Sequence, residues 1–197
     1  MGSQPFLKVN LKGERFMNEY MPYDLVLHAA ASQPYHTYCT VWDSKYAEDC
    51  EHFATHGCSR LYPHVNGTNP VFPMDYVQAM NADLQDQGYI VEADTIEELA
   101  DKLGLPKETF TATVDHYNEL AAKGEDEDYG KENYRLSTLS EAPFYGVRQA
   151  GGYLICTIDG IQIDDNMHAI DQDFKAIPGL YVIGDMSGNY FSGSYPS

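Results

Sequence analysis

The sequence predicts a mixed α+β fold, and three observations support this prediction. The first is a pair of neighbouring helices over residues 95–124, each with an apolar stripe on one face. The second is a change of character at Pro143, after which short apolar runs alternate with glycine-rich turns, as is typical of strands. The third is the composition: 43% of the 197 residues are hydrophobic, which is enough for one core or two small ones.

The first part of the chain predicts short strands and helices. Alternating apolar and polar residues over 6–11 indicate a strand, and Lys12 and Gly13 form the turn of a hairpin. Pro22 suits the first turn of a helix that runs to Ala31. Five elements follow in order: a buried strand over 36–42, a helix over 44–56, a loop over 62–73, a helix over 74–87 and a strand over 89–92.

The helical pair begins at the clearest local signal in the sequence. Residues 95–98 form a capping box, in which the Thr95 hydroxyl accepts a hydrogen bond from the Glu98 amide and the Glu98 side chain reaches back. Gly104 ends this helix, and Gly124 ends the next. These signals therefore predict a helical hairpin.

Residues 143–197 are expected to form a β-rich segment of an incomplete domain. Strands are predicted over 144–149, 153–158 and 161–163. Residues 177–185 predict a buried strand that runs into a Gly/Ser loop, and such a loop normally leads into a covering helix. We place a domain boundary near residue 142.

Charge limits the expected partners. The formal net charge of −18 argues against nucleic acid and anionic membrane surfaces, because both would be repelled. No run of 18 or more apolar residues is present, so no membrane insertion is expected. The acidic run over 125–128 is interpreted as a solvated loop, with a cation site as the alternative. No Gly-x-Gly-x-x-Gly follows a predicted strand, so the sequence lacks the usual dinucleotide-binding loop.

Cysteines and histidines offer one rival site. The four cysteines are scattered, which is unlike a disulfide scaffold, and free thiols are expected. His52 and His56 lie four residues apart on a predicted helix, flanked by Cys50 and Cys58, and this spacing permits two metal ligands on one face. All four side chains cannot share a face, and no distant ligand pair is evident, so no metal site is predicted.

Several motifs, in this order along the chain, resemble one family of flavoproteins. The outer two are Val9-Asn10-x-x-Gly13-Glu14-Arg15-Phe16-x-Asn18-Glu19 and Ile177-Pro178-Gly179-Leu180-Tyr181-Val182-Ile183-Gly184-Asp185. Between them lie Thr95-Ile96-Glu97-Glu98-Leu99-Ala100, Val114-x-x-Tyr117-Asn118-Glu119-Leu120 and Gly124-Glu125-Asp126-Glu127-Asp128-Tyr129-Gly130. The set is similar to the flavoprotein family of succinate dehydrogenase and fumarate reductase, whose soluble branch includes flavocytochrome-type fumarate reductases, urocanate reductase and ketosteroid dehydrogenases.

The resemblance implies an FAD-binding domain that is interrupted by a substrate-covering, or capping, domain. Residues 1–142 would then be the capping domain, incomplete at its N-terminal side, and residues 143–197 would be the returning segment of the FAD-binding domain. The implied partners are a small-molecule substrate and the rest of the FAD-binding domain, with an electron-donor protein as a further candidate. A bacterial source is expected. The family has both exported and cytoplasmic members, so the resemblance does not predict the cellular location of this protein.

The resemblance also implies FAD as the cofactor and assigns residues to it. The strand over 177–185 ends in the family beside the ribityl chain of FAD, which makes Asp185 the acceptor for ribityl hydroxyls, with Gly184 next to it. Thr157 and Gly160 would approach the isoalloxazine ring through their backbones, and Ser194 is placed with them. This chain is not expected to hold FAD tightly by itself, because it lacks a phosphate-binding helix N-terminus.

Departures from the fumarate reductase pattern bear on the substrate. The family motif Arg-Phe-x-Asn-Glu-x-x-x-Arg-Asp carries a proton-delivering Arg at the position of Tyr23 in this chain. Ile155 and Tyr195 stand where the family has a substrate-binding His and Arg. Two carboxylates require fixed cationic donors, so a C4-dicarboxylate substrate is not expected. Asp159, in place of a Gly, adds further negative charge.

Tyrosines are the candidate catalytic residues. Ser194-Tyr195-Pro196 resembles the Tyr-Pro of the ketosteroid dehydrogenase branch, in which a Tyr polarises a substrate carbonyl, and Tyr23 is the candidate proton donor. We therefore expect part of an FAD-dependent oxidoreductase that reduces an activated C=C bond by hydride transfer. A carboxylate-bearing enoate substrate is one alternative, and a stand-alone acidic binding module is another. The isolated chain is expected to be inactive.

Overall fold

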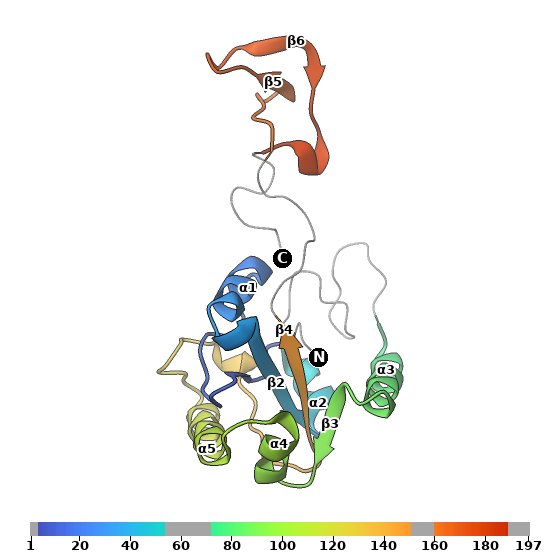
Figure 1. The fold of residues 1–197 in the computed structure, drawn as a ribbon, viewed down its shortest axis with the longest axis vertical. Helices are drawn as coiled ribbons and strands as arrows, with labels where there is room; N and C mark the ends of the chain where they lie inside the picture. The colour runs from blue at the N-terminus through green and yellow to red at the C-terminus, as the bar shows by residue number, and fades with distance from the viewer. Residues whose placement is uncertain (1–3, 54–71, 151–159, 189–197) are drawn as a thin grey trace. The chain divides into compact units, whose positions relative to one another are not determined.

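The computed structural model describes residues 4–53, 72–150 and 160–188 (Figure 1). The chain divides into two compact units. The first comprises Met1–Met21 and Leu25–Gly151, and the second comprises Pro22–Asp24 and Gly152–Ser197. The first unit therefore extends past residue 142, because the strand that follows Pro143 belongs to its sheet.

An antiparallel sheet of four strands organises the first unit. Its order is β1-β2-β4-β3, with β1 over Lys8–Asn10, β2 over Thr37–Asp43, β4 over Phe144–Ala150 and β3 over Ile90–Ala93. In register, Lys8 faces Thr40, Trp42 faces Tyr145 and Val91 faces Gly146. The sheet thus joins segments from both ends of the unit, so it forms only when distant parts of the sequence meet.

Two hydrophobic cores lie on the two faces of this sheet, and side chains alternate between them. Cys39 and Val41 pack with Leu99 and Phe110, whereas Trp42 packs with residues of other helices. This explains why β2 is buried almost throughout, as the sequence predicted. The helices and turns are α1 (Tyr23–Ala31), η1 (Pro34–His36), α2 (Tyr46–His52), α3 (Met74–Asp86), α4 (Ile96–Leu103), α5 (Lys107–Lys123) and η2 (Asn133–Arg135).

The predicted capping box is confirmed. The Glu98 amide donates to the Thr95 hydroxyl at 3.1 Å, and the Glu98 carboxylate accepts from the Asp94 amide at 3.0 Å. Gly104 and Gly124 end the two helices in the left-handed conformation that lets a helix terminate. The helical hairpin is therefore local in origin. None of the helices in the described residues is both long enough and apolar enough to span a membrane.

The predicted hairpin at residues 6–17 differs from expectation. Only Lys8–Asn10 form a strand, and all three residues are buried, so the apolar–polar alternation does not separate a core face from a solvent face. The second strand of the predicted hairpin is reduced to a single antiparallel β-bridge between Val9 and Arg15. The physical reason is that both faces of β1 are covered, and the polar side chains on it find hydrogen-bond partners.

The second unit contains β5 (His168–Ile170), β6 (Ala176–Tyr181) and the turn η3 (Gly184–Met186). The strand predicted over 161–163 is reduced to two isolated bridges, Ile161 to Ser187 and Ile163 to Ala169. The prediction of a buried strand at 177–185 is wrong for β6, whose six residues are all exposed. Within the described residues β6 pairs only with β5.

Gly13 provides a test of this packing. Its φ is +79°, and an added Cβ would lie 2.9 Å from the backbone nitrogen of Phe110, whereas Gly88, with φ +78°, has open space around it. We expect Gly88→Ala to cost about 1 kcal/mol of unfolding free energy, since only backbone strain is added. Gly13→Ala should cost about 1–3 kcal/mol more because of overpacking.

The measurement is urea unfolding followed by the fluorescence of Trp42, the single and buried tryptophan. Equal losses in the two variants would contradict the close approach of the hairpin turn to α5.

Candidate functional site

Two of the predicted FAD-binding segments meet in the second unit. The Ile161 amide donates to the Met186 carbonyl at 2.9 Å, and the Gly188 amide donates to the Ile161 carbonyl at 3.0 Å. This places Gly160 directly beside the turn that contains Gly184 and Asp185. A Cβ on Gly160 would lie 2.3 Å from the Met186 carbonyl oxygen, so this position requires glycine.

The turn over Gly184–Met186 is open to solvent. Gly184 has φ +65°, and apart from the glycine itself and its two chain neighbours no atom lies within 4 Å of its ideal Cβ position. The Asp185 side chain is exposed, and within the described residues no donor hydrogen-bonds to its carboxylate. An unpaired carboxylate next to an accessible glycine backbone suits a ligand with hydroxyl groups, because the carboxylate accepts hydrogen bonds and the glycine permits close approach.

The other predicted site residues cannot be placed in the same way. Thr157, Ser194 and Tyr195 lie outside the described residues. The backbone of Tyr23 is described, and it forms the first residue of α1. The turn with Gly160, Gly184 and Asp185 is therefore the part of the predicted site that the structure brings together.

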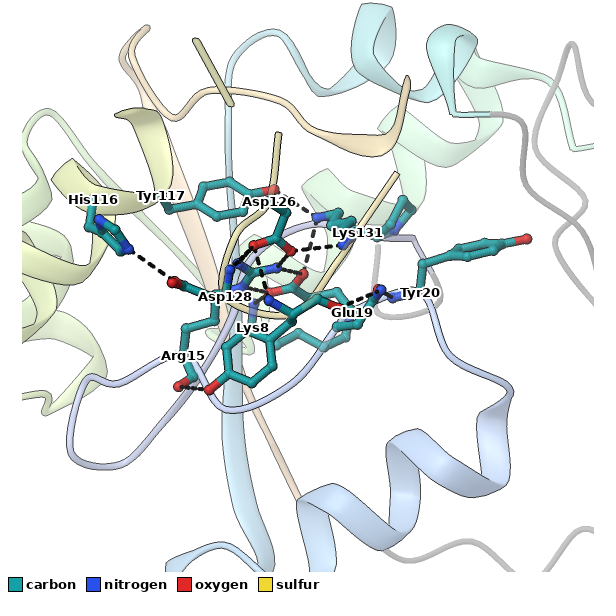
Figure 2. A network of polar contacts seen from close by, with 12 residues as sticks. Lys8, Arg15, Glu19, Tyr20, His116, Tyr117, Asp126, Asp128 and Lys131 are labelled. Carbon is teal, nitrogen blue, oxygen red and sulfur yellow. Dashed lines mark hydrogen bonds and ion pairs between the residues drawn. The ribbon is translucent and has the colours of Figure 1, made fainter. Parts of the chain in front are cut away.

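A buried ion cluster lies in the first unit, close to the sequence that leads into α1 (Figure 2). It consists of five side chains: Lys8, Arg15, Glu19, Asp126 and Lys131. Arg15 bonds Asp126 through two nitrogens at 2.8 and 2.7 Å, and Glu19 through Nε at 2.8 Å. Lys131 Nζ lies 3.2 Å from the Glu19 carboxylate. The side chains of Glu19, Asp126 and Lys131 are fully buried.

Aromatic rings surround the cluster. The Arg15 guanidinium lies 5.1 Å from the centre of the Tyr117 ring and 4.9 Å from that of Tyr129. Lys131 donates to the Tyr117 hydroxyl at 2.7 Å. These contacts shield the charges from water. They also provide partners for the cationic groups where these are not paired with a carboxylate.

Asp126 corrects the interpretation of the acidic run as a solvated loop. Its neighbours Glu125 and Glu127 are exposed, but Asp126 is 6% exposed and also accepts from the backbone amide of Lys131 at 2.9 Å. The physical reason is that a cation from a distant segment, Arg15, enters the loop. The sequence does not predict the cluster, although Arg15 and Glu19 lie four residues apart in the motif that begins at Val9.

Opposite charges keep both carboxylates ionised. Burial would raise the pKa of Asp126, but hydrogen bonds from Arg15 and from the Lys131 amide outweigh burial and hold it well below its ordinary value. Burial acts in the same direction on Glu19, and the charge of Lys131 together with Arg15 outweighs it and lowers the pKa. The cluster therefore holds two anions against three basic side chains.

Lys8 is the surplus base. Its side chain is buried, and its Nζ donates to the Gln4 carbonyl at 2.9 Å. Burial lowers the pKa of Lys8 from 10.5 to about 7, against the attraction of Glu19. The protonation of Lys8 therefore changes near neutral pH, whereas the four other members keep their charges.

A groove of about 430 Å³ borders the cluster. On its rim, His116 Nε2 lies 3.0 Å from the Asp128 carboxylate. The lining residues are Glu14, Arg15, Thr113, His116, Tyr117, Asp128 and Tyr129. Among the described residues no group of three or more His, Cys, Asp or Glu side chains is arranged to hold a metal ion.

The family is established by comparison with known proteins. A family model described as an FAD binding domain matches residues 4–197. The chain belongs to this FAD binding domain family. The match covers both units, and the family resemblance predicted from the motifs is confirmed.

Individual relatives agree with the family. A 3-oxosteroid 1-dehydrogenase from Mycobacterium tuberculosis is 32% identical over 210 residues, covering 95% of this chain and 34% of the relative. A vinyl phenol reductase from Lactiplantibacillus plantarum is 29% identical over 198 residues, covering 98% of this chain and 38% of the relative. The solved 3-ketosteroid delta1-dehydrogenase of Sterolibacterium denitrificans shares the fold, with a TM-score of 0.66 and 23% identity over 98% of this chain and 35% of that one. The chain thus spans little more than a third of these relatives.

Breaking the buried pair should destabilise the fold strongly. We expect Asp126→Asn to lower the unfolding free energy by about 3–5 kcal/mol, because Arg15 is left buried without its full counter-charge. The matched control is Glu127→Gln next to it, since the Glu127–Lys123 pair is exposed and its loss should change the unfolding free energy little. Urea unfolding measures both. Similar small losses in the two variants would contradict the burial of Asp126.

Lys8 should make stability depend on pH. Unfolded Lys8 holds its proton up to about pH 10.5 and folded Lys8 up to about pH 7, so unfolding takes up a proton between these values. Stability from this group therefore rises with pH in that window, by up to about 1.4 kcal/mol per pH unit. Lys8→Met should remove this contribution from the dependence of the unfolding free energy on pH. Parallel pH profiles of wild type and variant in urea unfolding would contradict the lowered pKa.

Proposed function

We propose that this chain works within a larger FAD-dependent oxidoreductase that acts on a CH–CH bond activated by a conjugated carbonyl or phenol group. In this proposal the first unit contributes to a substrate-covering cap, and the second unit is part of the FAD-binding domain. The observation that carries the proposal is the family match across both units, because it includes the turn in which Gly160 meets Gly184 and Asp185.

The residues of that turn fit the cofactor. Asp185 would accept hydrogen bonds from ribityl hydroxyls, and the open space at Gly184 would let the cofactor approach the backbone. Thr157 and Ser194 would also contact the cofactor, and this assignment rests only on the resemblance to the family. When bound, FAD supplies the donor or acceptor of a hydride. The exposed apolar side chains of β6 are consistent with a covering part of the same FAD-binding domain.

The proposed substrate is neutral or weakly charged and carries a ring carbonyl or a phenol. Tyr23, Ile155 and Tyr195 stand where fumarate reductases use cationic or imidazole side chains, so a dicarboxylate would lack its donors. The names of two relatives, 3-oxosteroid 1-dehydrogenase and vinyl phenol reductase, agree with this class. Tyr195 would polarise the carbonyl, and Tyr23 would hold the proton that is exchanged with the substrate carbon.

The proposal predicts that the full-length protein copurifies with FAD and turns over a 3-oxosteroid or a vinyl phenol faster than fumarate. Tyr195→Phe should lower kcat by roughly 10²- to 10⁴-fold without loss of FAD, because the phenol acts only in the reaction. Tyr89→Phe is the control, since Tyr89 is 64% exposed and far along the chain from the proposed site.

Three results would contradict parts of this account. Protein without flavin would favour the alternative of an acidic binding module. Turnover of fumarate alone would contradict the substrate class. Full activity in Tyr195→Phe would remove this residue from catalysis while leaving the flavoenzyme assignment intact.

A further inference from the structure

Residues 17–22 connect the hairpin to α1 without forming helix or strand. A segment of this kind has no backbone ladder to fix its position, so its place depends on side-chain contacts. Tyr23, the proposed proton donor, follows immediately. A shift of this segment would therefore move the start of α1.

Three consecutive residues of the segment contact one loop, residues 126–135. Asn18 Nδ2 donates to the Tyr129 carbonyl at 3.3 Å, and Glu19 pairs with Lys131 at 3.2 Å inside the buried cluster. The Arg135 guanidinium lies 3.0 Å from the centre of the Tyr20 ring. We call this set of three contacts the clamp.

The loop itself is also held by contacts within it and by Arg15 of the hairpin. Asp126 accepts from the amides of Asp128 at 3.2 Å and Lys131 at 2.9 Å, and it binds Arg15. Arg135 is 5% exposed and lies 2.7 Å from the Glu132 carboxylate. The Tyr129 hydroxyl donates to the Arg15 carbonyl at 3.2 Å. The loop is thus held by several contacts and in turn contacts the irregular segment. Supporting contacts of this kind are what hold a functional side chain in a fixed position.

We propose that the clamp fixes the start of α1, and that Tyr20 and Arg135 are positioning residues for Tyr23. This inference rests on the proposed function, in which Tyr23 carries the proton. Tyr20 and Arg135 act through the backbone of residues 20–23 and do not contact the substrate. A displacement of about 1 Å in a catalytic group is enough to slow a reaction by roughly 10²-fold.

The test uses the full-length protein with its FAD. We expect Tyr20→Leu and Arg135→Leu each to lower kcat by about tenfold or more, with KM and FAD content unchanged, because orientation and not binding is lost. The solvent deuterium isotope effect on kcat should rise, since proton transfer becomes the slower step. Tyr20→Phe keeps the ring and should match wild type. The double variant should be no slower than either single one.

Two further measurements separate positioning from general destabilisation. Hydrogen exchange in Arg135→Leu should speed up over residues 17–26 but not over α4. Lys123→Met, which removes an exposed ion pair on α5, should change neither exchange in 17–26 nor kcat. If the leucine variants do not fold, Arg135→Lys keeps the charge, loses the planar stack and should give the same changes.

The outcomes distinguish the inference from the proposed function. Wild-type protein without FAD or turnover overturns both. If wild type is active and Tyr23→Phe is slow, an unchanged kcat and isotope effect in Arg135→Leu overturns the clamp alone. If Tyr23→Phe is as active as wild type, Tyr23 carries no proton and the clamp has no catalytic residue to position, which also overturns the inference.

Discussion

The bond between Arg15 and Asp126 joins side chains that are 111 residues apart in the sequence. It fastens the first hairpin to the loop after α5, and both carboxylates of the buried cluster depend on the same guanidinium. Buried charges of this kind are unfavourable when isolated and stable only when every partner is present. The relative position of the hairpin and the loop therefore depends on this interaction, and the same guanidinium holds Glu19 in the segment before α1.

Local features were predictable from the sequence because neighbouring residues create them. The capping box at Thr95 needs only Glu98 three residues later, and Gly104 ends α4 through its own backbone. The burial of Asp126 was not predictable in this way. A carboxylate in a run of acidic residues is normally solvated, and its cation lies in a hairpin at the other end of the unit.

In the candidate site, too, some features were predictable from the sequence and others depend on contacts between distant segments. Gly184 and Asp185 were assigned through a motif, and the structure adds that Gly160 lies directly against their turn, which no local pattern indicates. The exposure of β6 also could not be derived, because the apolar run Ile177–Ile183 indicates burial without indicating what buries it. Both findings depend on contacts between segments rather than on spacing.

The most direct test of the account is a crystal structure of the full-length protein with FAD bound. We expect the ribityl chain to contact Asp185 and the backbone at Gly184, and the side chains of Tyr23 and Tyr195 to border one substrate cavity beside the flavin. The Arg15–Asp126 pair should be intact beneath the segment that leads to Tyr23. A flavin bound away from the turn at Gly184, or a cavity bordered by neither tyrosine, would contradict the account.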